Sequence, residues 1–160
     1  AMARSLRFYG METTYYAERN GYNSRLDEVQ AAILSLKLPQ VEPWVKRRRE
    51  IAARYTAAFE GTAVTPPREL NYGQHAYYIY VVEHEDRDGM IERLAARGVM
   101  CNISYPWPIH TMRGYQHFGY REGDLPISER KAKRIFSLPM YPYLTDDQVE
   151  TVINAVKAVM

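Results

Sequence analysis

One loop of the sequence gathers side chains that could bind a polar cyclic ligand. Tyr105, Trp107 and His110 stand in a short segment that also holds Pro106 and Pro108. Proline fixes the backbone φ angle, so the rings would point in set directions, and a histidine changes its charge near neutral pH. Two interpretations of His110 stay open. It contacts a ligand, or it is a loop residue hydrogen-bonded to a backbone carbonyl.

A second candidate binding residue, Asn23, precedes the first predicted helix. Asn23 could donate its side-chain amide to an anion at the helix N-terminus, where free backbone N–H groups and the helix dipole favour negative charge. Asparagine at this position is ordinarily an N-cap, which is the alternative interpretation. Arg25, Asp27 and Glu28 fall in the first turns, and a solvated helix face explains them as well.

The sequence lacks the residue patterns of several other kinds of active site. The sequence has no Gly-x-Ser-x-Gly elbow, no recognisable Cys–His pairing and no glycine-rich phosphate loop. Cys101 is the only cysteine, so neither an intramolecular disulfide nor a paired-cysteine metal site is possible. No histidine spacing indicates metal ligands on a helix. We therefore expect no metal site.

Composition narrows the class of partner. The 160 residues carry a formal net charge of +2, which is too small to imply a nucleic-acid or membrane partner. The basic run 46–49 lies opposite a predicted apolar stripe, and we interpret it as a solvated surface. No stretch approaches the roughly 18 to 20 apolar residues of a membrane span, and the first residues do not have the pattern of a leader. We expect a cytoplasmic protein.

Helices and a loop are predicted in the first part of the chain. Residues 10–23 have no helical or strand period and are predicted to form a long irregular connection. A capping-box pattern at Ser24 and apolar residues at helical spacing predict a helix over about 24–38. Pro39 and Pro43 should interrupt it. An apolar stripe then predicts a second helix that Gly61 ends.

The rest of the chain predicts a mixed α+β fold. Thr145 and Gln148 form a capping-box pattern for the last helix, with Leu144 and Val149 at the hydrophobic-staple positions. Strand, helix and strand in succession indicate an α+β sandwich. The expected elements are an extended linker at 64–68, a strand at 75–82, a helix at 86–97, a strand at 99–105, a proline-rich loop at 105–112 and a short helix at 128–136.

Four segments in order resemble a known family. The sequence GYNSRLDEVQAAIL at 21–34 is similar to the segment that follows the cofactor-lysine region in DegT/DnrJ/StrS-type nucleotide-sugar aminotransferases of fold type I. The segments HAYYIYVV at 75–82, GVMCNISYPWPIH at 98–110 and FSLPMYPYLT at 136–145 follow in the family order. The resemblance covers nearly the whole chain.

The resemblance implies a fold and an activity. Residues 1–62 would be the connecting loop and long helices leading out of a large cofactor domain, and 63–160 a small C-terminal α+β sandwich domain. Family members use pyridoxal 5'-phosphate to move an amino group, usually from glutamate or glutamine, to a keto group of a nucleotide-linked deoxysugar, here expected to be dTDP-linked. They are homodimers with shared active sites, so the expected partners are a nucleotide sugar, an amino-acid donor and a second subunit.

The resemblance also implies site residues. Asn23 would reach the cofactor phosphate of the neighbouring subunit, with Tyr15 or Tyr16 nearby. His110 would face the sugar and Tyr105 would contact the nucleotide phosphates; Arg25 is a further substrate-binding candidate.

The resemblance has limits. The Schiff-base lysine, the aspartate at the pyridine nitrogen and the phosphate-binding hydroxyl loop would all lie upstream of this chain, and neither Lys37 nor Lys46 stands in the lysine motif. The family often has histidine where this chain has Tyr78. Two alternatives therefore stay open: a sugar dehydratase of the same family, and a stand-alone non-catalytic dimerisation or sugar-binding module.

Overall fold

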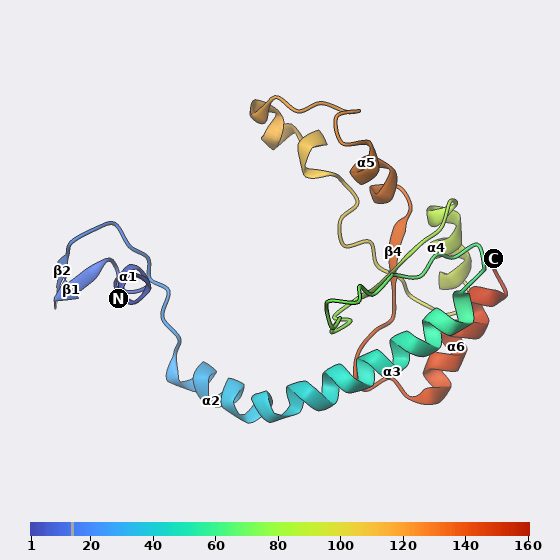
Figure 1. The fold of residues 1–160 in the computed structure, drawn as a ribbon, viewed down its shortest axis with the longest axis horizontal. Coiled ribbons are helices and arrows are strands. Elements are labelled where there is room, and N and C mark those ends of the chain that lie inside the picture. The colour runs from blue at the N-terminus through green and yellow to red at the C-terminus, as the bar shows by residue number, and fades with distance from the viewer. Residues whose placement is uncertain (14) are drawn as a thin grey trace. The chain divides into compact units, whose positions relative to one another are not determined.

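The computed structural model describes residues 1–13 and 15–160, which form two compact units, 1–41 and 42–160 (Figure 1). The division between the two units falls at the first residue of the helix that carries the predicted apolar stripe. The domains 1–62 and 63–160 that the resemblance implies stay a prediction. None of the helices in the described ranges combines the length and apolar character needed to cross a membrane.

The first unit is more regular than its sequence predicted. It contains α1 (Met2–Leu6), an antiparallel pair of short strands, β1 (Met11–Thr13) and β2 (Tyr16–Ala17), then α2 (Glu28–Lys37) and the 3-10 turn η1 (Leu38–Gln40). The prediction of an irregular 10–23 connection was thus wrong over these strands. Gly10 and Gly21 allow two backbone segments to touch, since a Cβ on Gly21 would lie 2.0 Å from the nitrogen of Gly10.

The first long helix begins later than predicted. Its N-cap is Asp27, which makes no side-chain capping bond, and the capping box expected at Ser24 does not form. Ser24 instead donates its backbone N–H to the carbonyl of Arg7 at 2.9 Å, and Asn23 forms a β-bridge with Phe8. This pairing holds the chain extended, so the helix cannot start there. No side chain of α2 is buried.

The second long helix supplies one wall of the core. The helix α3 (Val41–Phe59) buries Ile51, Tyr55 and Phe59 completely, as the apolar stripe predicted. Pro39 lies in η1, between the two helices, whereas Pro43 lies in the first turn of α3 and does not interrupt it. The first turn has no intrahelical acceptors for its N–H groups, so a residue without an N–H is tolerated there.

The sheet differs most from the prediction. The strands β3 (Tyr80–Glu83) and β4 (Ile135–Leu138) pair antiparallel, from Tyr80 with Leu138 to Glu83 with Ile135. The strand predicted over 75–82 therefore forms only at its end, because Tyr77 adopts a φ of +47° that a strand excludes. The strand predicted over 99–105 is reduced to a bridge between Asn102 and Ser137, and the linker at 64–68 contributes a bridge between Thr65 and Glu83.

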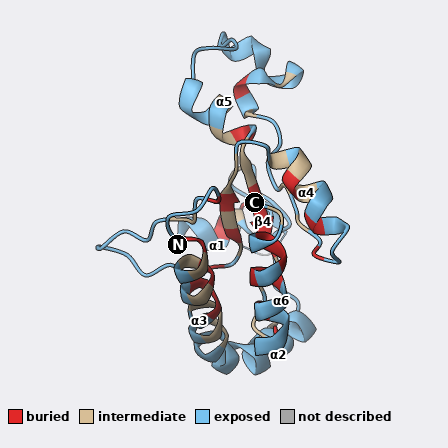
Figure 2. Ribbon diagram, turned by 90° about the vertical axis from the view of Figure 1, so that its right-hand side faces the viewer, coloured by how far each residue is buried: buried red, intermediate tan, exposed pale blue. Residues whose placement is uncertain are grey.

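Three helices complete the second unit. The helix α4 (Arg87–Ala95) is capped by Asp86, which accepts from the backbone N–H of Gly89. The helix α5 (Pro126–Ala132) ends earlier than the predicted 128–136 helix, and β4 takes over its last residues. The helix α6 (Asp146–Lys157) has the predicted capping box between Thr145 and Gln148. Figure 2 shows buried residues along α3, β4 and α6, which enclose the core.

The three arginines of the basic run are structural anchors and not the solvated surface predicted, whereas Lys46 is exposed as predicted. Arg47 donates to the carbonyl of Leu144 at 2.8 Å, and Arg48 donates to the carbonyls of Tyr77 at 3.1 Å and Tyr78 at 2.6 Å. Arg49 donates to the carbonyl of His75 at 2.8 Å. The guanidinium groups thereby fasten α3 to the segments before β3 and before α6. Sequence spacing did not reveal these carbonyl partners.

Candidate functional site

His110 is buried and bonded to a carboxylate. It lies in the 3-10 turn η2 (Ile109–Thr111), in the excursion that leaves the sheet after Asn102, and it is only 8% exposed. Its Nε2 lies 2.9 Å from Oε1 of Glu129 in α5. The backbone-carbonyl partner considered for His110 is thus wrong, since the partner is a side-chain carboxylate.

Glu129 joins three segments through one carboxylate. Besides contacting His110, it accepts from the backbone N–H of Gly123 at 2.8 and 3.0 Å and from that of Leu125 at 3.3 Å. The hydrogen bond from His110 lowers the pKa of Glu129 most, and the two backbone N–H groups lower it further. Glu129 is therefore ionised at neutral pH.

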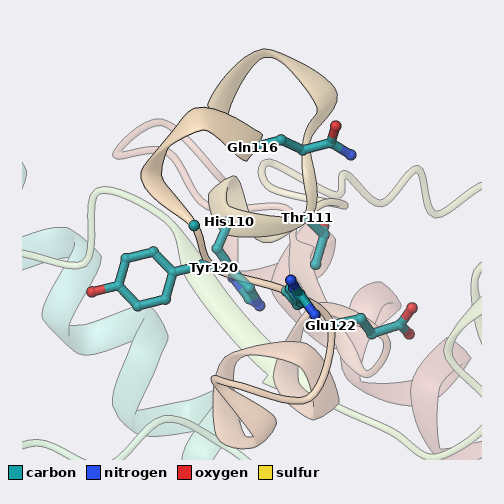
Figure 3. A pocket seen from close by; sticks show the side chains of 7 residues that line it. His110, Thr111, Gln116, Tyr120 and Glu122 are labelled. Carbon is teal, nitrogen blue, oxygen red and sulfur yellow. The ribbon is translucent and has the colours of Figure 1, made fainter.

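Two clefts adjoin this pair. The first has a volume of about 510 Å³ and is lined by His110 together with Thr111, Gln116, Gly119, Tyr120, Arg121 and Glu122. In Figure 3, His110 and Thr111 project from the same turn, and the ring of Tyr120 points away from the other labelled side chains.

The second cleft lies on the Glu129 side of the pair. It measures about 410 Å³ and includes Trp107, Glu129, Arg87 and Lys133, with Thr111 and Glu122 shared with the first cleft. Tyr105 is 74% exposed and lines neither cleft. Of the predicted loop residues, the structure brings Trp107 and His110 to neighbouring clefts and leaves Tyr105 on the surface.

The first unit holds the other predicted residues. Tyr15 and Arg25 line one cleft of about 590 Å³, and the guanidinium of Arg25 lies 5.7 Å from the ring centroid of Phe8. Tyr16 and Asn23 are exposed outside that lining. Asn23 stands five residues before α2, so it neither caps this helix nor lies at its N-terminus, and the helix-dipole argument for anion binding there was wrong.

Sequence reasoning missed Glu129. The residue lies nineteen positions after His110, and its local sequence indicates only the start of a helix. No short motif links the two, so a spacing rule could not have paired them. Within residues 1–13 and 15–160, no group of three or more His, Cys, Asp or Glu side chains is arranged to hold a metal ion.

Comparison with known proteins places the chain in a family. Residues 1–157 match the DegT/DnrJ/EryC1/StrS aminotransferase family. The chain belongs to this aminotransferase family. The predicted resemblance is confirmed, together with the mixed α+β fold of fold-type-I sugar aminotransferases.

Relatives within the aminotransferase family are closely similar. A dTDP-3-amino-3,4,6-trideoxy-alpha-D-glucose transaminase from Micromonospora megalomicea is 47% identical over 98% of this chain and 44% of its own length. A dTDP-3-amino-3,6-dideoxy-alpha-D-galactopyranose transaminase from Aneurinibacillus thermoaerophilus is 36% identical over 94% of this chain and 41% of its own length. The crystal structure of DesV from S. venezuelae superposes with a TM-score of 0.93 at 36% identity, over 97% of this chain and 42% of DesV. The chain therefore spans less than half the length of these relatives.

The family implies pyridoxal phosphate, and the donors of the first unit suit its phosphate. The side chains of Tyr15, Tyr16 and Asn23 carry neutral hydrogen-bond donors on the exposed surface, and Arg25 adds a cation. Glu12, the carboxylate in the cleft of Tyr15 and Arg25, is paired with Arg19. Of these residues, Tyr15 and Arg25 line one cleft and together offer a hydroxyl and a cation to an anion, whereas Tyr16 and Asn23 lie outside that lining. No lysine of this chain is assigned to the cofactor aldehyde.

Proposed function

We propose that the protein containing this chain transfers an amino group from glutamate or glutamine to a keto group of a dTDP-linked deoxysugar. The observation that carries the proposal is the 47% identity, over 98% of the chain, to a transaminase whose name specifies a dTDP-linked 3-amino sugar. The Aneurinibacillus relative also forms a dTDP-linked 3-amino sugar by its name. A dTDP-3-keto-deoxysugar is therefore the first substrate to test.

We assign roles to the residues of this chain. Bound pyridoxal phosphate would supply the electron sink for transamination and would hold the amino group between the two half-reactions. Asn23, with Tyr15 or Tyr16, would bind the cofactor phosphate in the active site of a neighbouring subunit of a homodimer. The buried position of His110 beside a cleft supports a sugar-facing role for it.

Two further residues are assigned to substrate binding. The exposed hydroxyl of Tyr105 would donate to the nucleotide phosphates. The guanidinium of Arg25 would bind an anionic group of the substrate, since it lines a cleft beside Tyr15. We place the protein in the cytoplasm, where nucleotide sugars would be available to it.

The test is a pair of variants in the complete holoenzyme. Asn23→Ala should weaken cofactor retention by about 1.5 to 3 kcal/mol, the usual worth of a hydrogen bond to a charged group. His110→Ala should slow amination of the keto-sugar more than the half-reaction with the amino donor. Equal losses in both half-reactions would refute the sugar-facing role, and unchanged cofactor affinity would refute the role of Asn23.

The product of the reaction separates the alternatives. Incubation with a dTDP-3-keto-deoxysugar and glutamate should give the amino sugar, measured by mass spectrometry. Loss of a sugar hydroxyl without amination would instead identify a dehydratase. Absence of both reactions, together with no absorbance band that borohydride removes, would identify a non-catalytic module.

A further inference from the structure

The carboxylate of Glu129, which contacts the imidazole of His110, is shielded from water and held in place. The side chain of Glu129 is 15% exposed and that of His110 is 6% exposed, so water has little access to either. Both oxygens of Glu129 accept hydrogen bonds from groups of this chain, as described above. The carboxylate is thus held in one orientation, and it presents an acceptor to Nε2 of His110.

The contact determines where a neutral imidazole carries its proton. An ionised carboxylate only accepts hydrogen bonds, so Nε2 must be the protonated nitrogen. Within the described residues, no group of the chain is hydrogen-bonded to Nδ1 of His110. Nδ1 therefore keeps a free lone pair, and His110 lines the 510 Å³ cleft.

We propose that Glu129 is a positioning residue that fixes the Nε2–H tautomer of His110, so that Nδ1 accepts a hydrogen bond from a substrate hydroxyl in the cleft. This inference rests on the proposed function for the identity of the ligand, a sugar. It adds a specificity determinant, because a site built to accept from a hydroxyl discriminates against an analogue that lacks it. The opposite tautomer would present Nδ1–H as a donor, which can bond a keto oxygen as well as a hydroxyl oxygen, so the requirement for a hydroxyl would be lost.

A loop is held by the same carboxylate. Gly123 has a φ of +98° and directs its N–H to Glu129, so the segment before α5 closes beside His110. Glu129→Gln keeps an oxygen that can accept from these N–H groups, but it removes the charge and adds an NH2 donor. The amide can therefore bond either tautomer of His110, so residue 129 no longer selects one of them. The loop that contains Gly123 still has an oxygen that accepts its N–H.

The experiment uses the holoenzyme labelled with 15N-histidine, at a pH where the imidazole is neutral. The His110 resonances are assigned with His110→Gln. In the unmodified protein we expect a protonated Nε2 and a bare Nδ1, and in Glu129→Gln a mixture of tautomers. A matched control is Glu83→Gln, which removes an ion pair with Lys131 of α5 without touching His110. The control should keep the single tautomer.

Kinetics give a second readout. Glu129→Gln should raise KM for the keto-sugar about tenfold, as expected for one lost hydrogen bond, with the amino-donor half-reaction unchanged. Glu129→Asp, which restores a carboxylate, should recover part of the loss. A bare Nε2 in the unmodified protein overturns the proposal whether or not the variants fold. An unchanged tautomer in Glu129→Gln also overturns it.

The outcomes separate this proposal from the proposed function. If the predicted tautomer is found but no keto-sugar is aminated, the proposed function fails and the effect of Glu129 on His110 stands. If amination occurs with the other tautomer, the proposed function stands and the role of Glu129 fails.

Discussion

The hydroxyl pair between α3 and β3 should be a measurable unit of stability. Tyr80 is fully buried, and its hydroxyl lies 2.8 Å from the hydroxyl of Thr56. Its ring packs edge-on against Tyr55, with centroids 5.2 Å apart at 63°. Tyr80→Phe keeps this packing and removes only the hydrogen bond. Because the remaining hydroxyl on half-buried Thr56 reaches some water, we expect a loss of about 1 kcal/mol, at the low end of the range for an unsatisfied partner.

A double-mutant cycle isolates the contact. Thr56→Val alone should also destabilise by about 1 kcal/mol, because it leaves the buried hydroxyl of Tyr80 without a partner. The double variant should lose clearly less than the sum of the two single losses, with a coupling of roughly 1 kcal/mol, since neither partner is left unpaired. Urea unfolding with unchanged m values supplies the free energies. Losses that add within about 0.3 kcal/mol would show that this hydrogen bond does not couple α3 to β3.

Three further predictions concern charge and reactivity. The hydrogen bond from Arg47 is the largest cause of the lowered pKa of Asp146. A depressed folded pKa gives stability that is present above the usual pKa and is lost as the pH falls through the lowered one, so Asp146→Asn should flatten the acid side of the stability profile. Burial raises the pKa of Cys101 to about 11. Iodoacetamide at pH 8 should therefore alkylate Cys101 far more slowly than it alkylates free glutathione. Equal rates would contradict the burial of this thiol. One guanidinium nitrogen of Arg48 bonds both adjacent carbonyls. Arg48→Lys puts an ammonium on a shorter side chain in its place and should cost about 1 kcal/mol in thermal unfolding; a midpoint equal to that of the parent protein would refute the anchoring role.

Features determined by neighbouring residues could be predicted from the sequence where no distant segment competed for the backbone, unlike the capping box expected at Ser24. The capping box of Thr145 and Gln148 and the buried stripe of Ile51, Tyr55 and Phe59 depend on spacing within one helix, and both formed as expected. The end of α3 before Gly61, whose φ is positive, was also predicted, because glycine favours this backbone conformation after a helix.

Features determined by distant partners could not be predicted in this way. The aromatic and β-branched residues of 75–79 suit a strand, but the carbonyls of Tyr77 and Tyr78 are taken by Arg48. The strand β4 depends on pairing with β3, and its residues 135–136 were assigned to the end of a helix. Likewise, Glu129 joins the candidate site only through the fold, since its bond to His110 spans nineteen positions. The same separation explains why a backbone partner for His110 was expected.

The arginine anchors of α3 recognise main-chain oxygens of the segments that they hold. Arg47, Arg48 and Arg49 each bond at least one carbonyl, and a carbonyl is present whatever the side chain. Replacing the exposed side chain of Tyr78 therefore leaves the carbonyl contact of its anchor available. Such a replacement removes the ring whose centroid lies 5.8 Å from the guanidinium of Arg48, but the main-chain hydrogen bonds that attach the segment remain, so the segment should tolerate sequence change at residue 78 better than it tolerates loss of Arg48.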